Sequence, residues 1–145
     1  MSFKFKFQPI LNLRKHHEDQ CRTRFKEEQI KLWRIEEELA TLQTVKKQRE
    51  AETEQLSVGV ISLEHLLSSS KYLAYLRRKQ DETNARRVCQ ENEVEQARTV
   101  LVQARKETKV MEKLKEKRAR AEAEERLREE QKTLDEIAIT QIYRN

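Results

Sequence analysis

The residues best able to do chemistry are the histidines and the cysteine of HHEDQC, residues 16–21. His17 and Cys21 are four positions apart, so on a helix they would face the same side and could offer two metal ligands. A structural zinc site needs four ligands, so an ordinary helix flank explains the pair better, and no metal or cofactor is expected. No serine or cysteine has a histidine and an acid at a telling spacing, and a single glycine excludes the glycine-rich loops that bind phosphates. We therefore expect no catalytic residues and no enzyme activity.

The composition indicates long helices. Of the 145 residues, 39% are charged and 36% hydrophobic, with one glycine and one proline. So few chain breakers leave little means of folding back repeatedly, and charge-rich helix formers are typical of coiled coils. Disorder is the alternative, but the leucines keep a helical spacing that a disordered chain does not need. We predict an all-α fold, a long two-helix antiparallel coiled coil with a helical C-terminal extension.

The sequence predicts a cytoplasmic protein. No window of about 18 apolar residues exists to span a membrane, and the N-terminus lacks the apolar core and cleavage site of a secretory signal. Cys21 and Cys89 are too few to imply a disulfide framework.

Alternating steps of three and four between apolar positions predict a first helix over 9–55, with Pro9 in its first turn. Residues 1–8 are expected to form an extended arm in which phenylalanines alternate with polar residues. We call the strip of positions expected to face the second helix the seam. In the first helix it consists of Leu11, Arg14, Glu18, Cys21, Phe25, Glu28, Leu32, Ile35, Leu39 and Leu42.

The segment LSVGVISLEHLLSSS, 56–70, holds Gly59 and five of the six serines. This turn chemistry predicts that the chain reverses there. A second helix is expected over 71–115. Beyond it, 116–145 should protrude as a charged helical extension that has no partner within the chain.

The seam of the second helix is polar in its middle. It runs through Leu73, Leu76, Gln80, Thr83, Arg87, Gln90, Val94, Ala97, Leu101, Ala104, Thr108 and Met111. Reversal near residue 61 would set the apolar positions between 32 and 42 opposite that polar middle, which is a poor match. Either the register is offset to use Ala85, Val88 and Cys89, or the helix pair gains stability from a partner.

Basic residues gather where the two chain ends should meet. Lys4, Lys6, Arg14 and Lys15 precede the first acidic residue, and in an antiparallel pair they would lie near the basic run 113–120. Such an electropositive end attracts an acidic protein surface, an anionic lipid headgroup or nucleic acid. Nucleic acid is not favoured, because glutamates interrupt the run and stacking aromatics are missing from it.

Four bulky residues crowd the two helical turns beside the expected reversal: Tyr72, Leu73, Tyr75 and Leu76. They cannot all face one partner helix, so some must lie on the surface. An exposed tyrosine beside a polar tip is a reasonable anchor for another protein.

Both ends of the chain resemble the flagellar export protein FliJ family. The opening fits a pattern F-x-F-x-x-x-L-x-x-R-x-x-x-E with Phe5, Phe7, Leu11, Arg14 and Glu18. The tail KLKEKRARAEAEERLREEQKTLDEIAI is similar to the ending of the family, with EQK followed by LDEIA. Length and a two-helix layout with a central break also agree, so the resemblance covers essentially the whole chain.

The resemblance implies a cytoplasmic component of the flagellar type III export apparatus, peripheral to the inner membrane at the flagellar base. Such proteins form an antiparallel coiled coil similar to the γ shaft of rotary ATPases. They bind the export ATPase hexamer at the centre of its ring, contact the cytoplasmic domain of the export gate and handle export chaperones. The open basic end would then bind the ATPase through Phe5, Phe7, Leu11, Arg14, Lys15, Lys117 and Arg118. The phenylalanine arm would be tied down either by folding over this basic end or by the ATPase. The region near the turn would bind the gate through Leu42, Tyr72 and Leu76.

A generic coiled-coil tether or scaffold is the alternative function, and a nucleic-acid-binding helical protein is a less favoured one. A tether would self-associate through an uninterrupted seam, whereas this seam is interrupted and the free chain is expected to be monomeric. Nucleic-acid binding would fall steeply with salt and need no protein partner.

Overall fold

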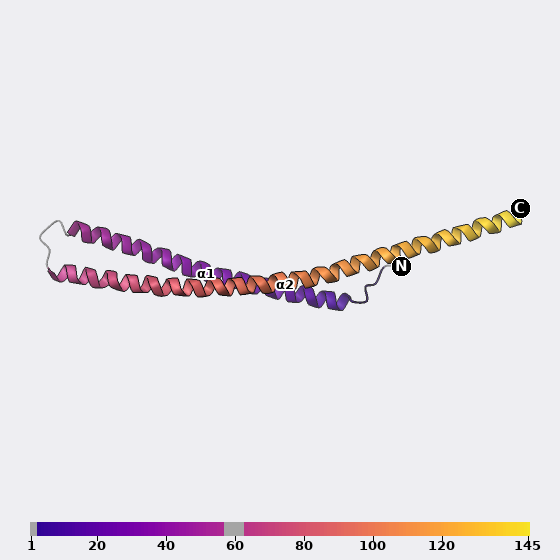
Figure 1. Cartoon of the computed structure of the whole chain (residues 1–145). Helices are drawn as coiled ribbons and strands as arrows, with labels where there is room; N and C mark the ends of the chain where they lie inside the picture. Colours follow the sequence, from indigo (N-terminus) through magenta and orange to yellow (C-terminus); the bar gives the residue numbers. More distant parts are fainter. Residues whose placement is uncertain (1–2, 57–62) are drawn as a thin grey trace. The chain divides into compact units, whose positions relative to one another are not determined.

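The computed structural model describes residues 3–56 and 63–145. Helix α1 spans Gln8–Leu56 and helix α2 spans Leu63–Arg144, and no strand occurs among the described residues (Figure 1). The predicted all-α fold with two long helices is confirmed. The chain reversal expected around Gly59 lies outside the described residues.

Helix α1 begins one residue before Pro9, which therefore occupies the first turn, where a missing N–H leaves no helical hydrogen bond unmade. The backbone N–H of Gln8 donates to the carbonyl of Phe5 at 3.1 Å, and that of Leu11 donates to the carbonyl of Phe7 at 3.0 Å. These bonds tie residues 3–7, which we call the aromatic arm, to the start of the helix.

The turn region expected over 56–70 is too long on its C-terminal side, because α2 already begins at Leu63. Residues 63–70 form the first two turns of this helix, with Ser68 and Ser70 exposed. In a helix, serine costs only about 0.5 kcal/mol relative to alanine, so the high helix propensity of the neighbouring leucines can compensate for the run of serines. Helix α2 also continues without interruption through the boundary expected at 115–116.

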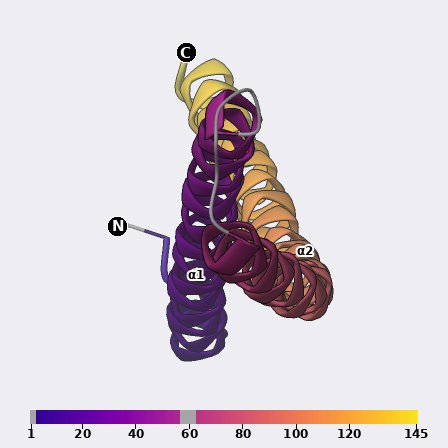
Figure 2. The ribbon, with the colours of Figure 1, turned by 90° about the vertical axis from the view of Figure 1, so that its left-hand side faces the viewer.

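The chain divides into two compact units: unit 1 comprises 1–20 and 102–145, and unit 2 comprises 21–101. Within unit 2 the two helices run antiparallel, since residues further along α1 contact residues progressively earlier in α2. The view in Figure 2 shows the two helices of this unit as separate ribbons. Their cross-helix contacts join Phe25 to Arg98, Glu28 to Gln90, Glu38 to Arg86 and Arg49 to Tyr72.

Of the two registers considered from the sequence, unit 2 adopts the one that faces the polar middle of α2 towards α1. Thr83 is fully buried, and Gln90 reaches across to Glu28. The offset register is wrong, because its three residues are all exposed: Ala85, Val88 and Cys89. A threonine is small enough to be enclosed between the helices, and the glutamine amide replaces lost water contacts with hydrogen bonds.

The predicted seams match the observed burial closely. In α2, all twelve seam positions from Leu73 to Met111 are buried or half-buried. In α1 the exception is Arg14, which is exposed. Its side chain is long enough to leave the seam and donate a hydrogen bond to Glu107 at 2.6 Å.

Unit 1 has a small core where the start of α1 meets α2. Leu11 on α1 is only 1% exposed, and Ala104 and Thr108 on α2 are 3% and 4% exposed. The hydroxyl of Thr108 donates to the carbonyl of Ala104 at 3.0 Å, so this buried polar group is satisfied. All residues from 123 to 145 are exposed, so the packed part of this unit ends at Glu122.

Candidate functional site

Positive charge is concentrated in the packed part of unit 1, residues 3–20 and 102–122, which we call the basic end. It holds 12 basic and six acidic residues, whereas 123–145 hold four basic and six acidic ones. Cross-helix ion pairs neutralise two of the acids, since Arg14 pairs with Glu107 at 2.6 Å and Arg105 with Glu18 at 3.7 Å. The excess of basic side chains suits this end to an acidic partner surface.

Within the basic end, the aromatic arm is folded against helix α2. The rings of Phe3 and Phe5 lie 6.5 Å apart, and those of Phe5 and Phe7 meet edge-to-face at 5.9 Å. Phe5 is only 7% exposed. The guanidinium of Arg118 lies 4.8 Å above the ring of Phe7, which anchors the arm to α2 through a cation–π contact. The arm therefore has a docked position within the chain itself.

All seven residues predicted to bind the ATPase belong to the basic end, but they have two kinds of environment. Phe5 and Leu11 are buried, so they support this surface from beneath. Phe7 is half-buried and covered by Arg118, and Arg14 is engaged with Glu107. The remaining predicted residues are exposed on the surface: Lys15, Lys117 and Arg118.

The three residues predicted to bind the gate lie in unit 2, and they too differ in how deeply they are buried. Leu76 is 3% exposed and belongs to the helix interface, and Leu42 is a half-buried seam residue. Tyr72 is half-buried, with the guanidinium of Arg49 4.6 Å from its ring, and it stacks on Tyr75 at 6.2 Å. Tyr75 is 47% exposed, so the stacked pair presents one ring to solvent.

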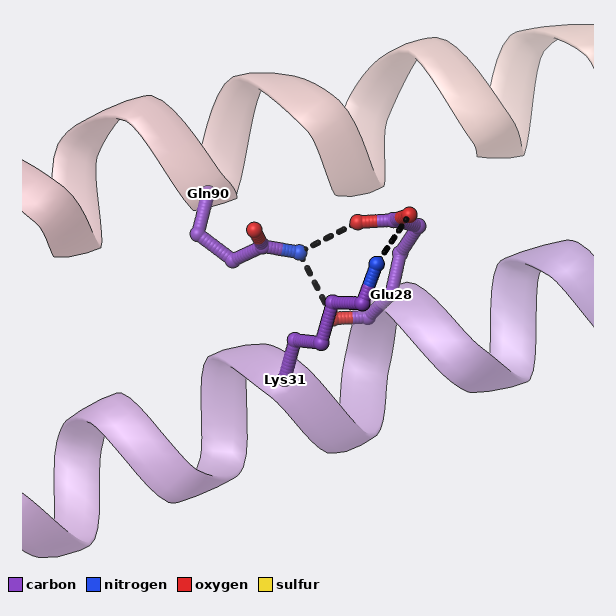
Figure 3. Close-up of polar contacts among 3 residues, drawn as sticks. All are labelled: Glu28, Lys31 and Gln90. Atoms are coloured by element: carbon purple, nitrogen blue, oxygen red, sulfur yellow. Dashed lines mark hydrogen bonds and ion pairs between the residues drawn. The ribbon is translucent and has the colours of Figure 1, made fainter.

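A polar contact in the middle of unit 2 was not predicted (Figure 3). The amide nitrogen of Gln90 donates to Glu28 twice, to carboxylate Oε2 at 2.5 Å and to the backbone carbonyl at 3.0 Å. Lys31 donates to the other carboxylate oxygen at 3.3 Å. The hydrogen bond from Gln90 is the main cause that lowers the pKa of the Glu28 carboxyl below its ordinary value, with help from Lys31 and Arg24. The seam positions of both residues were the signal that could have indicated this contact.

Two further properties of the described residues bear on the site. No group of three or more histidine, cysteine or acidic side chains among them could hold a metal ion, and Cys21, which was considered as a ligand, is buried. No helix in the described part of the chain is both long and apolar enough to cross a membrane.

Several large apolar residues are exposed in the described part of the chain. Trp33 is 58% exposed on α1 beside Ile30, which is 50% exposed. The end of α2 leaves large apolar side chains in solvent: Leu127, Leu134, Ile137, Ile139, Ile142 and Tyr143. The sequence indicated the stripe of Leu127, Leu134, Ile137 and Ile142 as one that another surface could cover, whereas the exposure of Trp33 and Ile30 was not predicted.

Together, the fold and the basic end define a two-helix coiled-coil protein whose candidate site is a surface for binding another protein. The family model of the flagellar FliJ protein matches residues 3–145, so the chain belongs to the FliJ family. Membership of this family supports a role as a component of the type III export apparatus, a structural role rather than an enzymatic one.

Among solved structures, CT670 from Chlamydia trachomatis, described as a YscO homologue, is similar in fold. The two chains are 21% identical, the match covers 94% of this chain and 93% of that one, and the TM-score is 0.55. A search of curated proteins found no match to the chain.

Proposed function

We propose that this protein is the central stalk of a flagellar type III export apparatus, with the basic end of unit 1 binding the ring of the export ATPase. Family membership supports the proposal. The observation that carries it is the folded basic end, where a docked aromatic arm and an excess of basic side chains form one surface. Aromatic and arginine residues are the usual anchors of protein interfaces, and basic charge speeds association with an acidic partner.

The proposal assigns different roles to the residues of the basic end. Lys15, Lys117 and Arg118 contact the ATPase directly, because they are exposed. Phe5 and Leu11 hold that surface in place from the core of the unit. Phe7 lies between these groups, since its ring is half-buried and carries Arg118.

The other partners belong to the same proposal. The cytoplasmic domain of the export gate binds near the stacked pair Tyr72 and Tyr75, which unit 2 presents partly to solvent. Export chaperones associate with the protein in the cytoplasm, and the export apparatus holds it at the inner membrane of the flagellar base. The free protein is a monomer, and a mass that rises with concentration in sedimentation experiments would argue instead for a self-associating tether.

The ATPase contact is tested by deleting residues 2–8. We expect binding to the purified export ATPase to weaken about tenfold or more, because the deletion removes the aromatic anchors of the surface. The far-UV helix signal should stay nearly unchanged, since α1 begins only at Gln8. Isothermal titration against the ATPase measures the first quantity and circular dichroism the second.

A charge-reversal pair sharpens this test. Lys117→Glu with Arg118→Glu should weaken ATPase binding and reduce its dependence on salt. The matched control is Arg128→Glu with Lys132→Glu, which reverses two basic residues in the exposed segment beyond the basic end. Equal losses in both variants, or unchanged binding after deletion of the arm, would contradict the proposed surface.

The gate contact is tested separately with Tyr72→Ala and Tyr75→Ala. We expect each variant to bind the purified cytoplasmic domain of the gate about tenfold more weakly while binding the ATPase normally. Tyr143→Ala is the control, because that tyrosine is 87% exposed but lies in unit 1. Gate binding that survives both substitutions in unit 2 rules out this assignment.

A further inference from the structure

The interface of unit 2 changes character along α2. Towards the start of the helix Leu76 is 3% exposed, and further along Val94 and Ala97 are 7% and 1% exposed. Between these apolar flanks, four consecutive seam positions are polar: Gln80, Thr83, Arg87 and Gln90. We call these four residues the polar middle.

The facing part of α1 covers Thr83 fully but leaves the rest of the polar middle half-buried. Leu32, Ile35 and Leu39 occupy seam positions of α1 but are only half-buried. A groove of about 420 Å³ lies between the helices at this level, lined in part by Ile35, Ala85 and Cys89. Apart from Thr83, the seam of α2 is therefore less buried here than at Val94 and Ala97.

Polar contacts replace apolar packing at this level. Gln90 bonds to Glu28, and Arg86 pairs with Glu38 at 2.9 Å, with both of the latter side chains about half exposed. The Nε atom of Arg87 is buried without a hydrogen bond, and its ion pair with Oε1 of Glu91 is long at 3.8 Å. Hydrogen bonds and exposed ion pairs are largely exchanged for water contacts when helices part, whereas the gain from apolar burial is lost. Separating the helices should therefore cost least at the polar middle.

We propose that the polar middle is a joint, at which α1 and α2 separate locally between residues 28–39 and 80–90 while the flanking segments stay packed. Opening releases Arg87 Nε to water and exchanges the bond between Gln90 and Glu28 for water contacts, so the remaining cost is mainly the exposure of Thr83 and of three half-buried apolar side chains on α1. If the protein is the stalk of the proposed function, the joint lets the helix pair yield to load without unfolding as a whole.

Hydrogen–deuterium exchange of the free full-length chain, read by mass spectrometry, tests the joint without any partner. We expect amides in 28–39 and 80–90 to exchange at least tenfold faster than those in 94–101, because a helical segment that has lost its partner helix is only marginally stable and breaks its own backbone hydrogen bonds more often. Equal exchange rates in these segments would overturn the proposal. Because no ATPase is present, this outcome is independent of whether the proposed ATPase contact is correct.

An apolar variant tests the cause of the opening. Thr83→Val, Arg87→Leu and Gln90→Leu together should slow exchange in 80–90 at least tenfold and leave 94–101 unchanged. The control is Asn84→Leu with Asn92→Leu, two exposed positions on the same helix, which should change neither segment. If amides in 80–90 exchange as fast in the apolar variant as in the native chain, the proposed cause is refuted.

Discussion

Two arginine side chains link helices α1 and α2 by lying over aromatic rings of the other helix. Arg49 lies 4.6 Å from the ring of Tyr72, and Arg98 lies 5.7 Å from that of Phe25. Each contact contributes about 0.5–1 kcal/mol when partly exposed. The long guanidinium arm lets a flanking position stabilise the interface without occupying the seam, so charge-rich sequence and interhelical packing are compatible.

Glu28 and Gln90 provide a pH-dependent contribution to the stability of unit 2. Because the hydrogen bond from Gln90 favours the charged carboxylate, the pKa of Glu28 is lower in the folded protein than its ordinary value of 4.5. The contribution is therefore fully present above that ordinary pKa and is lost as the pH falls through the folded pKa.

We predict that Glu28→Gln destabilises the protein at neutral pH and that the difference from the native chain shrinks as the pH falls below 4.5. Urea unfolding followed by circular dichroism between pH 7 and pH 3, on both proteins, measures this difference. The control is Glu124→Gln, in an exposed position beyond the basic end. A difference that stays constant over this pH range would show that Gln90 does not act on the charged carboxylate.

At the scale of the elements, helix α2 has a part that packs in the two units and a part, residues 123–144, that is exposed all round. Its seam is buried or half-buried up to Met111, and residues 114, 115, 119 and 122 remain half-buried near the aromatic arm. Beyond residue 122 the helix is held by local contacts, such as the pair of Arg126 with Glu122 at 2.7 Å. Such a pair adds about 0.2–0.5 kcal/mol, so helicity there depends on many small terms.

Removing residues 123–145 should leave the packed core intact. We predict a change in Tm of less than about 2 °C, because none of these residues is buried. The far-UV helix signal should fall by at most about one sixth, the share of this segment in the two helices, and by less if the isolated helix end frays. Calorimetry and circular dichroism of the truncated chain check both values. A fall in Tm of more than about 5 °C would mean that the segment packs on the core in solution.

The sequence predicted the elements well because their seams follow a simple period. The burial of Thr83 and Ala97 follows directly from alternating steps of three and four. The start of α2 could be narrowed only to 63–70, with the turn drawn as far as residue 70, since serines are typical of turns while their cost in a helix is small. The arm with Phe5 was expected to be tied down either over the basic end or by the ATPase, and its extended spacing does not tell which of these two surfaces it meets.

For the candidate site, the sequence predicted which residues gather at one end but not which partner each long side chain contacts. Clustering of basic residues at one end followed from the antiparallel arrangement, which brings 3–20 and 102–122 into one unit. The partner of each long side chain did not follow, since a lysine or arginine can reach several positions. Arg49 over Tyr72 and Arg14 on Glu107 are contacts of this kind.

On the scale of the whole molecule, charge is divided among parts of the chain in a way that composition alone conceals. The basic end carries 12 basic and six acidic residues, whereas unit 2 is nearly balanced with 15 basic and 14 acidic ones. The exposed segment 123–145 is acidic on balance. An acidic partner is therefore attracted to one part of the protein, and high salt should weaken that association more than it weakens the apolar packing of either unit.

The antiparallel path of the chain within unit 2 predicts short distances between residues remote in sequence. Spin labels attached through Arg24→Cys and Thr99→Cys, with Cys21→Ala and Cys89→Ser, would occupy exposed positions on neighbouring stretches of α1 and α2. Packed helix axes lie about 8–10 Å apart, so label separations below about 35 Å are expected once linker lengths are added. One continuous helix between these residues would instead separate them by about 110 Å. Electron paramagnetic resonance on labelled chains diluted with unlabelled protein measures the distance within one molecule, and the absence of a short distance would contradict the antiparallel helix pair.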